Sequence, residues 1–170
     1  QINSAPRMGV VPFIKAAKKS KFNVSDLVFS IAPKINAAGR IHSGKTAVEL
    51  LISDSLQTAN EISDQINKYN TERRSLDKSI TEEALEMIAA NPELQNKNTT
   101  VLYSPTWHKG VIGIVASRLI ETYYRPTIIL SKSGDVVSGS ARSVREFDVY
   151  NALQACTNEL LQFGGHKYAA

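Results

Sequence analysis

Residues 111–130 read VIGIVASRLIETYYRPTIIL, and they decide the fold class of this 170-residue chain. Residues 111–123 predict an apolar helix. Residues 126–130 start with a proline and continue with β-branched side chains, which predict a short buried strand. A helix joined so closely to a strand indicates an α/β domain.

The flanking residues extend this domain in both directions. Residues 100–103 predict a strand before the helix, and residues 136–141 predict another after a turn at residues 133–135. Residues 148–161 predict a final helix. The order strand, helix, strand, strand, helix indicates an α/β lobe around a mixed sheet.

A long helix precedes the lobe. Large side chains recur there at spacings of four and three residues, a seam of coiled-coil type that one arginine interrupts. The seam consists of Ile62, Ile66, Tyr69, Arg73, Leu76 and Ile80. We expect one helix to begin at Thr46, residues 53–54 to divide it from a second helix over residues 55–90, and residues 91–92 to end the second. The second helix is acidic and separates two differently composed ends, so it is interpreted as a connector between domains.

The first 45 residues predict a smaller helical region. Residues 9–19 suit a short helix, and Ser25 is expected to cap a second helix that Pro33 halts after residue 31. Residues 32–40 are rich in small side chains without periodicity, so they predict a tightly packed loop. The expected architecture is therefore α/β, with a small helical end, a long connecting helix and an α/β lobe with a mixed sheet.

Charge is unevenly distributed along the chain. Residues 1–50 carry eight Lys or Arg and two acids, residues 51–98 carry five and nine, and residues 99–170 carry seven and five. Two basic ends around an acidic middle fit a polyanion held between two lobes. An ordinary solvated surface explains the same charges equally well.

The single cysteine and the absence of long apolar runs bear on location. Cys156 falls within the predicted final helix and is expected to be a small buried residue, which leaves no disulfide or thiolate metal site. We expect a reducing, cytoplasmic location. No apolar run reaches membrane-spanning length, so no membrane association is expected.

Two stretches of the lobe carry groups that suit a phosphate. Residues 107–113 join the first strand to its helix, where unpaired N–H groups, His108 and Lys109 would favour an anion. Strand alternation places Ser140 and Arg142 on one face, and arginine can hold a phosphate with two hydrogen bonds. The alternatives are a packed Trp107 with a capping His108, and a polar strand that simply faces solvent.

Arg40 and the last seven residues supply further candidates. Arg40 follows a small-residue stretch, which alone is weak evidence for a phosphate ligand. In the sequence GGHKYAA, Gly164 and Gly165 would let the backbone approach a ligand closely, and His166 could contact a phosphate. The chain ends within this motif, so we expect it to be part of a longer protein.

Carboxylates are scarce where two-metal chemistry would need them. The first 50 residues contain only Asp26 and Glu49, and there is no Asp-x-Asp pair and no Cys/His spacing typical of zinc. A two-metal phosphoryl-transfer centre needs several converging carboxylates. We therefore expect this chain to bind no metal ion by itself.

Four motifs taken together resemble the RecJ family of single-strand-specific 5′→3′ DNA exonucleases, in the DHH phosphoesterase superfamily. The motifs are IAPKINAAGR at residues 31–40, WHKGVIGIVASR at residues 107–118, GSARS at residues 139–143 and GGHKYAA at residues 164–170. They occur in the family's order, with a long helix between the first and the second. The resemblance covers essentially the whole chain.

The resemblance implies a domain arrangement. Residues 1–45 correspond to the C-terminal end of the DHH catalytic domain, residues 46–95 to the connecting helix, and residues 96–170 to a truncated DHH-associated substrate-binding domain. In this family, single-stranded DNA lies between the two domains, and a Mn²⁺ or Mg²⁺ centre in the full-length enzyme hydrolyses the phosphodiester. The metal ligands are expected upstream of Gln1, so the isolated chain is expected to be inactive.

The resemblance also implies roles for single residues. Arg40, Ser140, Arg142 and Ser143 correspond to ligands of DNA phosphates, and Gly164, Gly165 and His166 lie against the strand. His166 is the catalytic candidate, because it would reach towards the scissile phosphate. The family often has arginine where Lys34 stands, which leaves the role of Lys34 open. Functions in DNA repair and recombination, and an interaction with single-strand-binding protein, are implied at the same level.

Two other functions remain open on the sequence. One is a related phosphodiesterase of the DHH superfamily that acts on short oligonucleotides or cyclic dinucleotides, although residues 107–118 favour RecJ over it. The other is a non-catalytic structural or interaction module. Single-strand preference and salt dependence of nucleic-acid binding distinguish the module from the nuclease.

Overall fold

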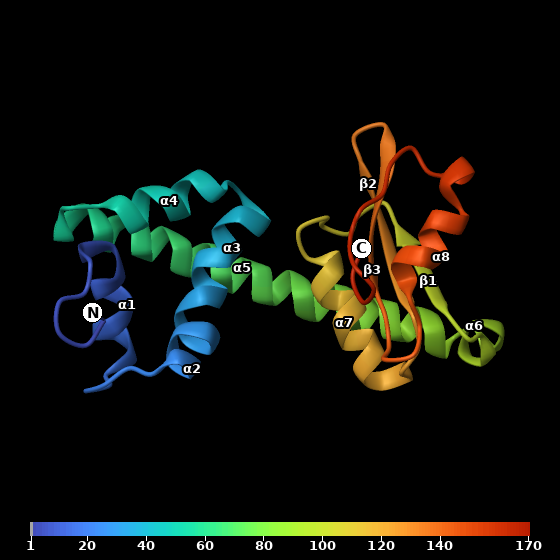
Figure 1. Ribbon diagram of the computed structural model, residues 1–170, viewed down its shortest axis with the longest axis horizontal. Coiled ribbons are helices and arrows are strands. Elements are labelled where there is room, and N and C mark those ends of the chain that lie inside the picture. The colour runs from blue at the N-terminus through green and yellow to red at the C-terminus, as the bar shows by residue number, and fades with distance from the viewer. Residues whose placement is uncertain (1) are drawn as a thin grey trace. The chain divides into compact units, whose positions relative to one another are not determined.

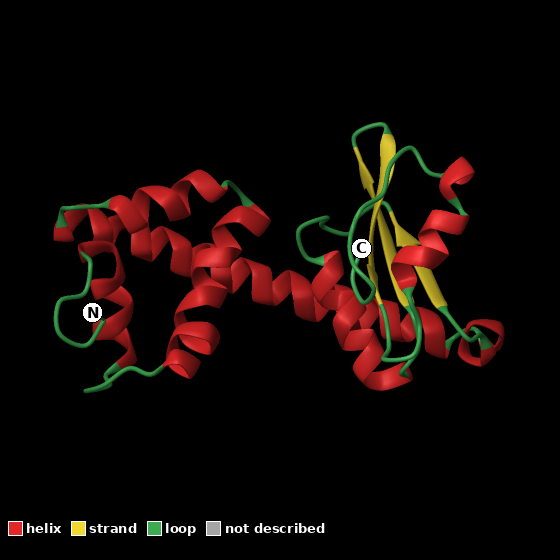
Figure 2. Cartoon of the chain, in the orientation of Figure 1, coloured by secondary structure: helices red, strands yellow, loops and turns green. Residues whose placement is uncertain are grey.

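The computed structural model describes residues 2–170, which divide into two compact units, residues 2–75 (unit 1) and Leu76–Ala170 (unit 2). Figure 1 gives the course of the chain, and Figure 2 shows that strands occur only in unit 2 among the residues described. The helices within residues 2–170 include none that combines the length and the apolar character needed to cross a membrane.

Unit 1 is built from short helices that pack against the first half of a long one. Its elements are η1 (Met8–Val10), α1 (Val11–Ala17), α2 (Val24–Asp26), the π-helical turn η2 (Leu27–Ile31), α3 (Ala32–Ile41), α4 (Gly44–Ile52) and the start of α5 (Leu56–Ala89). Their apolar faces form one core: Phe13, Phe22, Ile31, Ala38, Ala47, Leu50, Ala59 and Ile66. The small residues of this core let the helices approach closely.

The segment predicted as a loop at residues 32–40 is helical, so that prediction was wrong. Asn23, not Ser25, caps α2: its side chain accepts from the N–H of Asp26, whose carboxylate accepts from the N–H of Asn23. The backbone then continues through η2 into α3 without a break. Pro33 lies in the first turn of α3, directly after the π-helical turn η2, and it does not halt the helix.

The predicted division at residues 53–54 and the long helix after it are confirmed. α4 ends at Ile52 and α5 begins at Leu56. The seam of α5 supplies the core of both units, with Ile66 fully buried in unit 1 and Ile80 buried in unit 2. α5 ends just before Asn91, as predicted, and the Asn91 side chain caps a further short helix, α6 (Pro92–Asn96).

Unit 2 contains the expected mixed sheet. The strands β1 (Thr100–Ser104), β2 (Thr127–Ser133) and β3 (Val136–Arg142) lie in that order, with β1 and β2 parallel and β2 and β3 antiparallel. The parallel pair requires a crossover, which α7 (Ile112–Tyr123) supplies. α7 lies against one face of the sheet, and α8 (Val149–Ala155) lies on the other side (Figure 1).

The final helix is shorter than predicted. α8 stops at Ala155, and a 3₁₀ turn, η3 (Thr157–Glu159), follows it. Cys156 lies at this junction and is exposed, so the expectation of a buried cysteine was wrong. Helical spacing suggested burial, but the helix ends at that point and its last turn faces solvent.

Candidate nucleic-acid interface

Strand β3 places the two central candidates on one face, as predicted. Ser140 pairs with Ile129 and Arg142 pairs with Thr127 on β2, while Ala141 between them points to the opposite face and is buried. The guanidinium Nη1 of Arg142 donates to Ser140 Oγ at 3.2 Å and to the Ala141 carbonyl at 2.7 Å. A hydroxyl and a guanidinium are thus held together at the C-terminal end of β3.

The first turn of α7 lies directly against this pair. A Cβ added to Gly113 would stand 2.8 Å from Ser140 Oγ and 3.0 Å from Arg142 Nη2. Only glycine permits this approach without displacing both side chains. The N-terminus of a helix is the positive end of its dipole, which adds positive potential beside the arginine.

The C-terminal segment attaches to the outer edge of β3. Ala141 and Ala170 exchange two backbone hydrogen bonds, at 2.6 and 3.1 Å, and the Ser143 N–H donates to the Tyr168 carbonyl at 3.0 Å. Ala169 is the bridge partner of both Arg142 and His166. The segment that carries His166 is therefore anchored beside Arg142.

A tight turn sets the position of His166. Gly165 has φ of 153°, and a Cβ there would come within 2.4 Å of the Ala169 carbonyl oxygen and of the Ala170 Cα. Gly164 has open space around its Cα. The turn thus requires glycine at position 165 only, and His166 itself is exposed.

The other predicted ligands differ in their surroundings. Ser143 Oγ donates a hydrogen bond to the Phe147 carbonyl in the loop after β3, at 2.8 Å. The hydroxyl proton of Ser143 is therefore already used within the protein. Arg40 is exposed in the last turn of α3 and belongs to unit 1. The structure thus brings Ser140, Arg142, Ser143 and residues 164–166 together in unit 2, while Arg40 is part of the other unit.

The loop before α7 is braced from within unit 2. Trp107 is buried and donates its indole N–H to Glu83 of α5 at 2.9 Å, and its carbonyl accepts a hydrogen bond from the Ser131 hydroxyl. His108 Nδ1 accepts from the Gly110 N–H at 3.1 Å. These contacts fit the alternative hypothesis, in which Trp107 packs in the interior and His108 caps the loop. The Lys109 side chain is exposed.

The sequence did not predict an ion pair between α7 and α5. Arg118 donates from Nε and Nη2 to the two carboxylate oxygens of Asp77, at 2.7 and 2.8 Å, and Asp77 is buried. These hydrogen bonds raise the pKa of Arg118 above its ordinary value. The one signal in the sequence was an aspartate beside the apolar seam of α5, which no local pattern connects to residue 118.

The residues described do not fit a metal centre. Within residues 2–170, no group of three or more His, Cys, Asp or Glu side chains is placed to hold a metal ion. No catalytic step is therefore assigned to a metal held by these residues.

The lobe formed by residues 96–170 matches the family model of the DHHA1 domain. The lobe is thus a DHHA1 domain, and the Ser140–Arg142 pair lies on the last strand of its sheet.

The chain is similar over almost its whole length to RecJ proteins. It is 37% identical over 170 residues to the single-stranded-DNA-specific exonuclease RecJ of Bacillus subtilis, covering 96% of this chain and 21% of that protein. It is 32% identical over 176 residues to RecJ of Escherichia coli, covering 96% of this chain and 30% of that protein. The chain thus spans about a fifth to a third of the length of these relatives.

Solved structures agree with this assignment. The crystal structure of Thermus thermophilus RecJ in complex with Mg²⁺ superposes with a TM-score of 0.86 at 31% identity, covering 99% of this chain and 26% of that one. A structure of exonuclease RecJ bound to manganese gives 0.81 at 30% identity, covering 99% and 41%. Both confirm the predicted architecture of a helical end, a long helix and an α/β lobe.

Proposed function

We propose that this chain is the substrate-binding part of a single-strand-specific DNA exonuclease of the RecJ type, acting in DNA repair and recombination. In this proposal residues 1–45 end the catalytic domain, residues 46–95 connect, and residues 96–170 hold the DNA. The observation that carries it is the Ser140–Arg142 pair, held on β3 against the first turn of α7. RecJ relatives carry single-stranded DNA in their names, which supports the choice of ligand.

The chemistry of the pair suits a phosphodiester. Arg142 offers a planar set of N–H donors that can hold two phosphate oxygens at once, and Ser140 offers a hydroxyl on the same face. The start of α7 adds the positive end of its helix dipole. None of these groups reads a base, so binding is expected to depend on the backbone and not on sequence.

His166 is proposed to act on the reacting phosphate and not merely to anchor the strand. The Gly165 turn holds it exposed beside the Arg142 segment, where an imidazole can donate to a phosphate oxygen. Charge that develops on that oxygen in the transition state would be stabilised by such a donor. In the full-length enzyme, His166→Ala is expected to lower turnover by about 10²–10³ with a smaller effect on DNA affinity.

Hydrolysis itself is proposed to need residues beyond these 170. Two structures of Thermus thermophilus RecJ contain Mg²⁺ or Mn²⁺, and we propose that the full-length enzyme of this chain uses one of these ions. The isolated chain is expected to release no nucleotides with either ion. Cytoplasmic location and an interaction with single-strand-binding protein stay expectations of the sequence.

Fluorescence anisotropy tests the binding proposal on the chain as it stands. Labelled single- and double-stranded oligonucleotides of equal length are titrated at two salt concentrations against the wild type, Arg142→Ala and the control Arg145→Ala. Arg145 lies in the turn beyond β3, and Arg145→Ala removes the same charge as Arg142→Ala. We expect a preference for the single strand and a loss of roughly tenfold or more for Arg142→Ala only.

Two results would contradict the proposal. Equal, small losses for both variants would mean that the charge acts only by diffuse attraction. No preference for single strands together with no salt dependence would favour a structural module.

A further inference from the structure

The short hairpin that carries His166 is held by contacts that the proposed function leaves unused. His166 and Ala169 exchange two backbone hydrogen bonds, at 2.7 and 3.1 Å, which leaves Lys167 and Tyr168 as the two residues of the turn. Two-residue hairpins favour turns with positive φ, because such turns match the twist of the strands. Neither Lys167 nor Tyr168 has a positive φ, so we expect contacts from outside the hairpin to support it.

These contacts come from the loop that follows β3, because the chain returns to this strand after α8 (Figure 1). The Ser143 N–H donates to the Tyr168 carbonyl and the Val149 N–H donates to the Lys167 carbonyl, both at 3.0 Å. The Tyr168 hydroxyl donates to the Arg145 carbonyl, also at 3.0 Å. Of these three hydrogen bonds, only the one from the Tyr168 hydroxyl uses a side chain.

The loop itself is a firm support. The Ser143 hydroxyl donates to the Phe147 carbonyl at 2.8 Å, and the Phe147 N–H donates to the Val144 carbonyl at 3.2 Å, so the loop is closed on itself. Ser143 follows Arg142 directly in the chain. The hydroxyl bond of Tyr168 therefore joins the tip of the His166 hairpin to the end of the strand that carries Arg142.

The Tyr168 ring has one further contact, which a phenylalanine would keep. Lys167 Nζ lies 5.5 Å from the centre of the ring, within the range of a cation–π contact. The residue is 46% exposed, so burial contributes little to its position. Replacing Tyr168 with phenylalanine thus removes the hydroxyl bond and leaves the ring in place.

We propose that Tyr168 is a positioning residue for His166. Its hydroxyl holds the hairpin against the loop after β3, and this sets the position of the imidazole relative to the Arg142 guanidinium. This role rests on the proposed function, in which His166 acts on a phosphate of the strand that Arg142 holds. Tyr168 touches no substrate in this proposal. A misplacement of about 1 Å in a catalytic geometry can lower turnover by about 10²-fold, so a bond that fixes the hairpin matters for rate.

A double-mutant cycle in the full-length enzyme tests this role. Turnover and KM on a 5′-phosphorylated single-stranded oligonucleotide are measured for the wild type, Tyr168→Phe, His166→Ala and the double variant. Tyr168→Phe is expected to lower kcat by roughly 2–10-fold, the range of one hydrogen bond, with KM changed by less than about twofold. In the His166→Ala background, Tyr168→Phe is expected to cost nothing further, because the two residues act as a unit.

Tyr103→Phe is the matched control. Tyr103 lies on β1 and is 44% exposed, so this change removes a hydroxyl of nearly equal exposure from the strand at the other edge of the sheet. It is expected to leave kcat unchanged.

Hydrogen exchange on the 170-residue chain measures the hairpin directly. Tyr168→Phe is expected to speed exchange of the Ser143 and Val149 amides, whose acceptors lie in the turn, by about threefold or more. The amides of β2 are expected to keep their wild-type rates, since the change is local.

The outcomes separate a failure of this role from a failure of the proposed function. Equal losses from Tyr168→Phe in both backgrounds, or wild-type exchange and turnover in Tyr168→Phe, would overturn the positioning role and leave the proposed function standing. Faster exchange throughout β2 would also overturn it, because the variant would then loosen the whole lobe. Wild-type turnover in His166→Ala would contradict the proposed function of His166, and faster exchange in Tyr168→Phe would then mark Tyr168 as a structural residue only.

Discussion

Gly113→Ala should separate DNA binding from stability. The new methyl group would lie 2.8 Å from Ser140 Oγ and 3.0 Å from Arg142 Nη2, so both atoms must retreat by several tenths of an ångström. They are the ends of side chains, which can move without displacing the backbone. The same change replaces glycine with a good helix former inside α7.

These two effects have opposite signs. Alanine in place of glycine within a helix stabilises it by up to about 1 kcal/mol, so we expect unfolding stability to stay level or rise. Displacing a charged hydrogen-bonding pair from its phosphate is expected to lose about 1–2 kcal/mol of binding, a factor of roughly 5–30. A folded, stable variant with weakened DNA binding is the predicted outcome.

Thermal unfolding and anisotropy with a single-stranded oligonucleotide measure the two effects. Gly44→Ala is the matched control, because it makes the same change in the first turn of α4, where a Cβ meets nothing within 4 Å. It is expected to leave DNA affinity unchanged. Wild-type affinity in Gly113→Ala would refute the idea that the approach of α7 to Ser140 and Arg142 forms the site.

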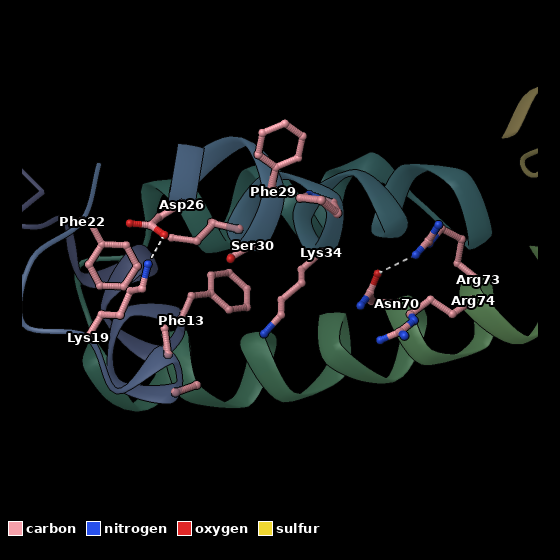
Figure 3. Close-up of a pocket in the computed structure, with 14 residues that line it drawn as sticks. Phe13, Lys19, Phe22, Asp26, Phe29, Ser30, Lys34, Asn70, Arg73 and Arg74 are labelled. Carbon is pink, nitrogen blue, oxygen red and sulfur yellow. Dashed lines mark hydrogen bonds and ion pairs between the residues drawn. The ribbon is translucent and has the colours of Figure 1, made fainter. Parts of the chain in front are cut away.

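Three further predictions follow from single contacts. Gly165→Ala should destabilise the C-terminal turn and weaken DNA binding, whereas Gly164→Ala, in open space, should not; proteolysis of the C-terminus and anisotropy compare them. Arg118→Gln removes two hydrogen bonds from buried Asp77 and should lower the unfolding free energy by about 1–3 kcal/mol, measured with denaturant. The pKa of Asp26 is held below its ordinary value of 3.8, chiefly by the hydrogen bond from Lys19 (Figure 3). The ionised Asp26 carboxylate should therefore stabilise the fold above pH 3.8, and this stabilisation should fade as the pH falls below that value. Carboxyl NMR titration checks the direction of the pKa change.

The sequence predicted the sheet and α7 of unit 2 well because these elements have strong local signals. Residues 111–123 are mostly apolar, Thr127, Ile128 and Ile129 are β-branched, and Gly134 marks the turn between β2 and β3. Strand alternation also placed Ser140 and Arg142 on one face. These predictions depend only on neighbours within a few residues.

Unit 1 was harder, because its helices lack such a signal. The residues of α3 are small and its Pro33 resembles a helix stop, yet packing of Ala37 and Ala38 into the core overrides the weak periodicity. Long-range contacts were equally invisible. Asp77 and Arg118, which form two hydrogen bonds, are 41 residues apart.

The most direct test of the proposed site is a crystal structure of the chain with a short 5′-phosphorylated oligothymidylate. The proposal predicts a phosphate within hydrogen-bond distance of Arg142 and Ser140, with His166 facing the same strand. Well-ordered DNA bound elsewhere on unit 2, with no phosphate in contact with Arg142 or Ser140, would contradict it.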